Sequence, residues 1–261
     1  MTDLAWLNAF GADLNSASNS ASVTAGNGVG NSIGGSVVAD ANQDVGNHGS
    51  SFGGGDNSAS NSASTVAGNG VGNHIGGSVI SEANQDVGNH GSSFFGGDNS
   101  ASNSASTVAG NGVGNHIGGS VISEANQDVG NHGSSFFGGD NSASNSASTV
   151  AGNGVGNHIG GSVISEANQD VGNHGSSFFG GDNFASNSAS TVAGNGVGNH
   201  IGGSVISEAN QDVGNHGGSL FGGQNFALNN ADATVANGSF NSVHGDVVAS
   251  ADQSVGAHHF H

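Results

Sequence analysis

The stretch NGVGNHIGGSVISEANQDVGNHG, residues 69–91, returns three more times along the chain without a single change. The further copies occupy residues 111–133, 153–175 and 195–217, so each begins 42 residues after the one before. Repetition at a fixed period is typical of solenoids and related arrays, in which a unit buries its apolar face by stacking on its neighbours. The period therefore predicts one elongated domain built as an array.

The 42-residue phase extends beyond the identical copies. Asn15 and Asn225 occupy the same phase on either side, and Gln253 still matches Gln211. Six copies are therefore expected. The predicted regions are an apolar N-terminal segment, residues 1–14, the repeat array, residues 15–256, and a histidine-rich tail, residues 257–261.

Each copy also contains a weaker internal repeat. Residues 59–77 align with residues 79–97, with Gly-Asn and a closing Gly-Gly pair at matching positions. This alignment predicts a structural unit of about 21 residues and hence two rungs in each 42-residue copy, with one larger rung per copy as the alternative. Gly-Asn and Gly-Gly pairs are turn signals, so each rung is expected to be strand, turn, strand, turn.

Apolar and polar residues alternate within a unit with the period of two that indicates a β-strand. The uncharged set is Val79, Ser81, Ala83, Gln85, Val87 and Asn89, whereas both carboxylates, Glu82 and Asp86, belong to the other set. We assign the uncharged set to the inward face. The predicted fold is an all-β β-solenoid whose rungs stack at about 4.8 Å.

Stacked identical rungs place like residues over like, which predicts ladders of amides and aromatic rings. The candidate ladders are Asn61, Asn103, Asn145 and Asn187; Gln85, Gln127, Gln169 and Gln211; and Phe95, Phe137 and Phe179 at one edge.

Composition excludes several functions. The 261 residues include 51 Gly and no Pro, Cys, Lys or Arg, and the formal net charge is −19. Binding to nucleic acid or to an anionic membrane surface requires basic side chains, so neither is expected as a partner. No apolar run is long enough for a membrane helix, and the first residues lack the basic and long apolar regions of a secretory signal. Export is therefore expected by a route without such a signal, or after its removal.

The segments QDVGNH, residues 85–90, and AGNGVGN, residues 67–73, resemble the repeats of bacterial functional amyloid subunits of the curli-like, or more loosely the Fap-like, type. The resemblance covers nearly the whole array. It implies an extracellular β-solenoid subunit that polymerises into biofilm fibres. The chain departs from the curli pattern in lacking Lys and Arg and in its 42-residue double unit.

Histidine recurs in two series that suggest metal binding by imidazole. The series are His74, His116, His158 and His200, and His48, His90, His132, His174 and His216. With two rungs per copy, neighbours in a series are expected about 9.6 Å apart, too far to share an ion. We therefore interpret both series as solvated turn residues. The weak metal candidates left are His258, His259 and His261.

The carboxylates recur in every copy, which argues against an active site because such a site is normally built once. No nucleophile–base arrangement stands out either, and no enzyme activity is expected.

The segment FGGDNSASN, residues 95–103, has the Gly pair and the Asp of a calcium-binding nonapeptide but not its later positions. No cofactor is required, and calcium stays open as a ligand. If acidic rungs alternate with uncharged rungs, the acids on the outer face are expected to discourage side-to-side association of solenoids.

The two ends of the array carry exposed apolar candidates. The N-terminal cluster is either a cap on the first rung or a contact with a further subunit, and the divergent last copy is the surface that would receive it. The candidate contact residues are Leu4, Trp6, Leu7, Phe10, Phe226, Leu228 and Phe240.

These patterns predict a secreted structural subunit of a biofilm-matrix filament, which self-assembles head to tail with itself as the partner. A calcium-dependent adhesin or surface-binding module is the alternative. An ice-binding solenoid is less favoured, because Thr occurs only about once per copy.

Overall fold

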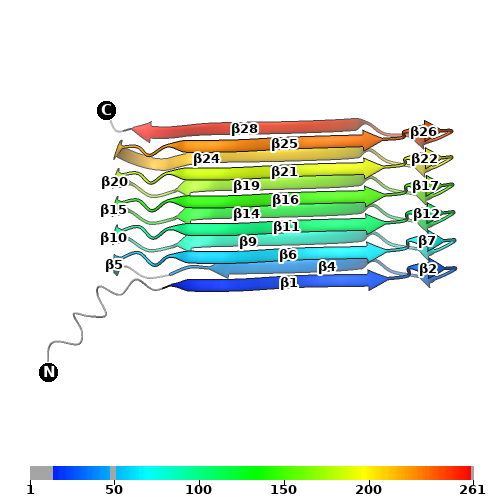
Figure 1. Cartoon of the computed structure of the whole chain (residues 1–261), viewed down its shortest axis with the longest axis horizontal. Coiled ribbons are helices and arrows are strands. Elements are labelled where there is room, and N and C mark those ends of the chain that lie inside the picture. Colours follow the sequence, from blue (N-terminus) through cyan, green and yellow to red (C-terminus); the bar gives the residue numbers. More distant parts are fainter. Residues whose placement is uncertain (1–13, 48–50, 260–261) are drawn as a thin grey trace, which may run out of the picture.

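The computed structural model describes residues 14–47 and 51–259 of the chain. Those residues form strands and turns and no helix, and so contain no helix that could cross a membrane. The long strands form a regular stack and run parallel within each sheet, with β1 (Asn15–Ala25) at one end and β28 (Val247–His259) at the other (Figure 1). The predicted all-β solenoid is confirmed.

Each copy supplies two long strands, which belong to two different sheets. The first sheet contains β1, β6 (Asn57–Ala67), β11 (Asn99–Ala109), β16 (Asn141–Ala151), β21 (Asn183–Ala193) and β25 (Asn225–Val235). The second contains β4 (Val37–Val45), β9 (Val79–Asn89), β14 (Val121–Asn131), β19 (Val163–Asn173), β24 (Val205–Phe221) and β28.

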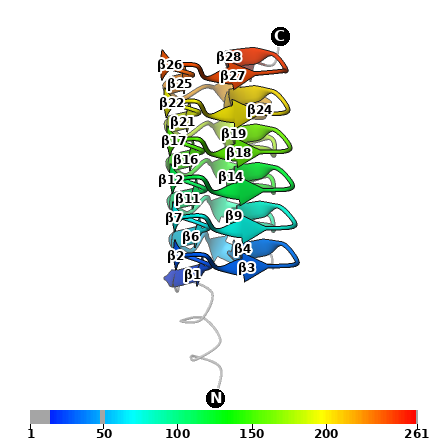
Figure 2. The same cartoon turned by 90° about the vertical axis from the view of Figure 1, so that its right-hand side faces the viewer.

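Short strands line the turns at both edges of these sheets (Figure 1), and one of these edges faces the viewer in Figure 2. At one edge, one column contains β2 (Gly28–Val29), β7 (Gly70–Val71), β12 (Gly112–Val113), β17 (Gly154–Val155), β22 (Gly196–Val197) and β26 (Gly238–Ser239). The next column contains β3 (Ser32–Ile33), β8 (His74–Ile75), β13 (His116–Ile117), β18 (His158–Ile159), β23 (His200–Ile201) and β27 (Ser242–Val243). The other edge carries β5 (Ser51–Gly53), β10 (Ser93–Phe95), β15 (Ser135–Phe137) and β20 (Ser177–Phe179).

The pairing register shows that one copy makes one coil. Asn57 pairs with Asn15 below it and with Asn99 above it, and Val121 pairs in the same way with Val79 and Val163. The prediction of two 21-residue rungs per copy is therefore wrong. The two similar halves of a copy form the two facing walls of a single 42-residue coil, and they resemble each other because both walls alternate inward and outward residues.

The predicted inward set of residues 79–89 is buried along its whole length. Ile75 and Val79 lie at one end of the interior, Ala63 and Ala83 at the middle, and Val87 at the other end. The small alanines allow the two sheets to approach closely, and each apolar residue packs on its copies in the coils above and below. The core is therefore a set of columns along the stack.

Glycine is required where coils meet backbone to backbone. Gly70 has a φ of 113°, a region that favours glycine, and a Cβ added there would overlap the carbonyl oxygen of Gly28 in the coil below. Gly130 lies in a strand, and a Cβ there would overlap the carbonyl oxygen of Gly172 in the coil above. The high glycine content is thus partly a consequence of this stacking.

Candidate functional site: an aspartate–histidine row

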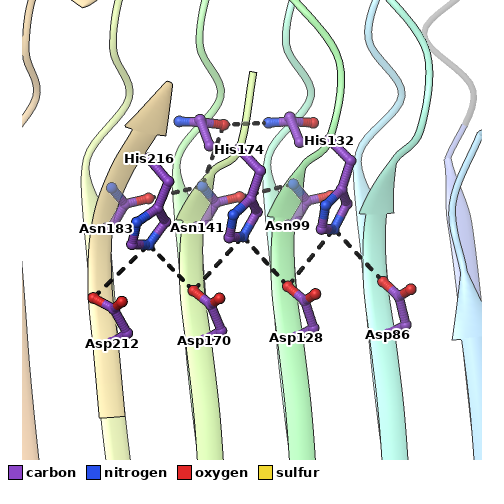
Figure 3. A network of polar contacts seen from close by, with 12 residues as sticks. Asp86, Asn99, Asp128, His132, Asn141, Asp170, His174, Asn183, Asp212 and His216 are labelled. Atoms are coloured by element: carbon purple, nitrogen blue, oxygen red, sulfur yellow. Dashed lines mark hydrogen bonds and ion pairs between the residues drawn. The ribbon is translucent and has the colours of Figure 1, made fainter. Parts of the chain in front are cut away.

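The densest group of titratable side chains among the described residues comes from the segment Gln-Asp-Val-Gly-Asn-His, which lies at the ends of β9, β14 and β19 and within β24. Asp86 lies on the outward face of β9, and His90 follows the strand's last residue. The spacing of four residues places both side chains on one side of the wall. Parallel in-register pairing then repeats the pair in the next coils, so that the side chains form a continuous row, which we call the Asp–His row (Figure 3). Its members are Asp86, His90, Asp128, His132, Asp170, His174, Asp212 and His216.

Each imidazole in the middle of the row lies between two carboxylates. His132 Nε2 is 3.6 Å from Oδ1 of Asp128 in its own coil and 3.8 Å from Oδ1 of Asp86 in the coil below. His174 Nε2 is 3.4 Å from Asp128 and 3.7 Å from Asp170. The contacts form a zigzag that links successive coils (Figure 3).

The imidazole rings themselves stack. The ring centroids of His90 and His132 are 4.7 Å apart with an interplanar angle of 3°, and His132 and His174 are also 4.7 Å apart. The second histidine series stacks in the same way, with 4.8 Å between His116 and His158. The predicted spacing of about 9.6 Å is therefore wrong, because it assumed two rungs per copy. The distance argument against metal binding fails with it.

The row is partly shielded from solvent. The imidazole side chains are 19–27% exposed and the carboxylates 42–48% exposed. Nε2 of His132 and His174 and Oδ1 of Asp128 are enclosed atoms that lack a well-formed hydrogen bond to the described residues. The row thus brings nitrogen and oxygen donors together without pairing them fully.

Burial and charge act on these groups in opposite directions. Burial raises the pKa of Asp86 and lowers the pKa of His132. For Asp128, burial alone would raise the pKa, but the approach of His174 and the neighbouring imidazoles hold it below its ordinary value. The approach of Asp170 raises the pKa of His216 more than burial lowers it.

The amide ladders predicted for the interior are present as hydrogen-bonded rows. Asn61 donates Nδ2 to Oδ1 of Asn103 at 3.2 Å, and Gln127 donates Nε2 to Oε1 of Gln85 at 2.8 Å. The remaining predicted members continue these rows, with Asn145 and Asn187 in the first and Gln169 and Gln211 in the second.

Further amide rows, which the sequence patterns did not predict, are also present. They run through Asn57 and Asn99, through Asn73 and Asn115, through Asn89 and Asn131, and, on the outer face, through Asn84 and Asn126. Their recurrence at the same phase in every copy was the signal that could have identified them.

The predicted aromatic column is also present, at an exposed edge. Phe95, Phe137 and Phe179 stack with centroids 5.2 and 5.1 Å apart, and Phe95 is 44% exposed. A second column through Phe94 and Phe136 lies beside it, with centroids 5.0 Å apart. Together they form a strip of rings facing solvent.

Asp98, the acid of the calcium-like segment, and the outward acid Glu82 both make contacts within the fold. Oδ1 of Asp98 accepts a hydrogen bond from the backbone N–H of Asp140 at 2.9 Å, and Oε1 of Glu82 accepts one from Asn84 Nδ2 at 2.9 Å. Like acids in successive coils lie one strand spacing apart, about 4.8 Å, and not the 9.6 Å expected. The predicted alternation of acidic with uncharged rungs is therefore wrong.

The predicted contact residues at the ends divide into two groups. Phe226, Leu228 and Phe240 are 50%, 53% and 91% exposed. The N-terminal candidates Leu4, Trp6, Leu7 and Phe10 lie outside the described residues, as does His261 of the tail. His258 and His259 belong to the end of β28, which carries the array past residue 256.

The fold and these rows define the chain as a parallel β-solenoid repeat protein. No protein-family model, curated protein or solved structure matches it.

Proposed function

We propose that the chain is a structural subunit of an extracellular filament, in which the last coil of one copy stacks on the first coil of the next. The observation that carries the proposal is that the two ends of the described solenoid expose strand edges whose residues match each other across such a joint.

The last coil exposes the columns that are buried elsewhere. Val205 and Val213 of β24 are fully buried, whereas their partners in β28, Val247 and Val255, are 54% and 49% exposed. An exposed edge of this kind is a template for pairing with another strand. At the opposite end, β1 shows its inward residues partly exposed.

The phase of the repeat specifies which residues would meet. If a second copy continues the 42-residue register, its Val37, Gln43 and Val45 lie over Val247, Gln253 and Val255. Its β1 then lies over β25 of the first copy. The inward columns from Val37 to Val45 thus continue with the same residue at each position, whereas the asparagine column through Asn47 meets position 257, which is alanine.

The amide rows have a direction that favours head-to-tail joining. Each glutamine in the interior row donates Nε2 to Oε1 of the glutamine in the preceding coil, from Gln85 onto Gln43 up to Gln253 onto Gln211. At one end of the row, Nε2 of Gln43 has no further glutamine to donate to, and at the other end Oε1 of Gln253 has no further glutamine to accept from. A head-to-tail joint places this donor on this acceptor, whereas a head-to-head joint opposes two donors.

Two positions that carry acids in the coil below carry serine in the last coil, whose own acids are Asp232, Asp246 and Asp252. Ser250 and Ser254 stand where the preceding coil has Glu208 and Asp212. In the continued register, Asp40 and Asp44 of a second copy would lie over these two serine hydroxyls. The joint therefore avoids placing one carboxylate directly over another, as happens between coils inside the chain. The absence of Lys and Arg leaves trypsin-like proteases no cleavage site, which suits an extracellular matrix.

Charge placed on the exposed end tests the proposal. The double variant Val247→Asp with Val255→Asp is expected to stay folded, because both side chains are exposed in the single chain, and to lose filament formation. Val113→Asp in an exposed turn of the third coil is the matched control and is expected to assemble as the unmodified chain does. Light scattering and negative-stain electron microscopy report the outcome, and undiminished filaments from the double variant would contradict the proposed joint.

A further inference from the structure

We infer that the Asp–His row binds divalent transition-metal ions such as Zn²⁺, with one ion for every two coils. This inference is independent of the filament proposal, because it concerns groups within a single chain.

Three groups of ligand atoms along the row have the composition of a transition-metal site. Each contains one carboxylate oxygen and two imidazole nitrogens, all within 4.8 Å of one another. The groups are Asp86, His90 and His132; Asp128, His132 and His174; and Asp170, His174 and His216. Two imidazoles with a carboxylate favour Zn²⁺, Ni²⁺, Co²⁺ or Cu²⁺ over Ca²⁺ and Mg²⁺, which prefer oxygen ligands.

The distances suit an ion after small side-chain movements. Tetrahedral Zn²⁺ with bonds of about 2.0–2.1 Å holds its ligand atoms roughly 3.3–3.4 Å apart. The carboxylate–imidazole distances are 3.6 and 3.8 Å in the first group and 3.7 and 3.2 Å in the third, which approach this value. The stacked imidazoles within each group, with centroids 4.7 Å apart in the first and 4.9 Å apart in the third, need to tilt toward each other.

The surroundings supply a route for the ion and for a fourth ligand. The aspartates of the row border a surface trough of about 950 Å³ that also contains the outer asparagine row through Asn84 and Asn126. A water molecule from this side completes four-coordination. The imidazoles lie deeper, with 19% of the His174 side chain exposed.

Shared ligands fix the stoichiometry. His132 belongs to the first and second groups, and His174 to the second and third. One imidazole nitrogen has a single lone pair for a metal, so neighbouring groups compete for it. Occupation of the first and third groups uses each histidine of the row once and leaves Asp128 unused. It holds two ions roughly two coils apart, about 9.6 Å, with the second group empty. The expected number is two ions per chain in this row.

This alternation predicts that identical substitutions one coil apart differ in effect. Asp170→Asn removes the carboxylate of the third group and is expected to reduce the bound Zn²⁺ from two ions to one. Asp128→Asn removes only the carboxylate of the second group, and is expected to retain both ions. The double variant His132→Asn with His174→Asn breaks all three groups and is expected to lose both ions.

The experiment is a titration of the metal-free full chain with Zn²⁺, followed by isothermal calorimetry and native mass spectrometry, with Co²⁺ absorption as a probe of the ligand geometry. His116→Asn with His158→Asn, in the other histidine row, is the control for the loss of two imidazoles and is expected to leave the count unchanged. Circular dichroism verifies that each variant is folded, and the tail histidines contribute equally to all of them. An equal count in every variant would mean an adventitious metal only and would overturn the inference, as would equal losses from Asp128→Asn and Asp170→Asn.

Discussion

Truncation of one interior asparagine, Asn103→Ala, tests whether the amide rows hold the coils together. Asn103 is buried and donates Nδ2 to the backbone carbonyl oxygens of Ala83 and Asn126, both at 2.8 Å. One of its two N–H groups is shared with Oδ1 of Asn145 at 3.1 Å, and its own Oδ1 accepts from Nδ2 of Asn61 at 3.2 Å. One side chain therefore joins both walls of the coil and the coils above and below.

The expected loss follows from these contacts. The two donations to backbone carbonyls contribute about 1 kcal/mol each, and leaving Oδ1 of Asn145 buried without its donor costs about 1 kcal/mol more. Asn103→Ala is thus expected to lower the free energy of unfolding by about 3 kcal/mol, a large effect for one substitution. Asn19→Ala is the matched control, because Asn19 has the same phase in the first coil, is partly exposed and, among the described residues, donates only to the carbonyl oxygen of Asn42, at 2.9 Å. Its expected loss is about 1 kcal/mol or less.

Urea unfolding followed by circular dichroism, at protein concentrations below those that give filaments, measures both losses. Hydrogen exchange then shows whether the loss is confined to neighbouring coils, as expected for an array with nearest-neighbour contacts. Equal losses from the two variants, or a loss below about 1 kcal/mol from Asn103→Ala, would refute the reasoning that buried amide rows stabilise the stack.

Three further outcomes follow from the stacking. Gly130→Ala is expected to prevent local folding, because the added methyl group overlaps the backbone of the coil above, whereas Gly34→Ala meets open space and is expected to be neutral in thermal unfolding. Ser250→Glu restores an acid at the proposed joint and is expected to slow filament growth in light scattering, with added salt restoring the rate; a rate independent of salt would contradict the electrostatic explanation. Burial, and secondarily neighbouring imidazoles, lower the pKa of His116 and His158 below the ordinary 6.5. The unfolded chain therefore binds protons at these two histidines more readily than the folded chain does. Their contribution to the free energy of unfolding is present above pH 6.5 and is lost as the pH falls through 6.5 toward the lower folded-state pKa. When the pH is lowered from about 7.5 to 5.5, the free energy of unfolding measured with urea is expected to fall less in the double variant His116→Asn with His158→Asn than in the unmodified chain. An equal fall in the two proteins would show that these two histidines do not titrate in this way.

Sequence patterns predicted the β-solenoid because strand alternation and exact repetition are local properties. The inward set from Val79 to Asn89 could be assigned from charge alone, since the opposite set carries Glu82 and Asp86. The glutamine and asparagine rows followed from the repeat as soon as stacking was assumed.

The size of the coil could not be read in the same way. Two similar half-repeats fit either two successive rungs or two facing walls, and only the pairing partners distinguish them. This error doubled the expected distance between copies of His132 and so concealed the Asp–His row. The row depends on the 42-residue register, which places Asp86 of one coil 3.8 Å from His132 of the next.

The most direct test of head-to-tail stacking is cryo-electron microscopy of the purified chain after unseeded incubation at micromolar concentration. Straight filaments are expected, with a layer line near 4.8 Å, one coil for every 42 residues, and joints at which Val37 of each added subunit lies over Val247 of the preceding one. Persistent monomers, or filaments whose subunits meet through their side walls with both solenoid ends exposed, would contradict it.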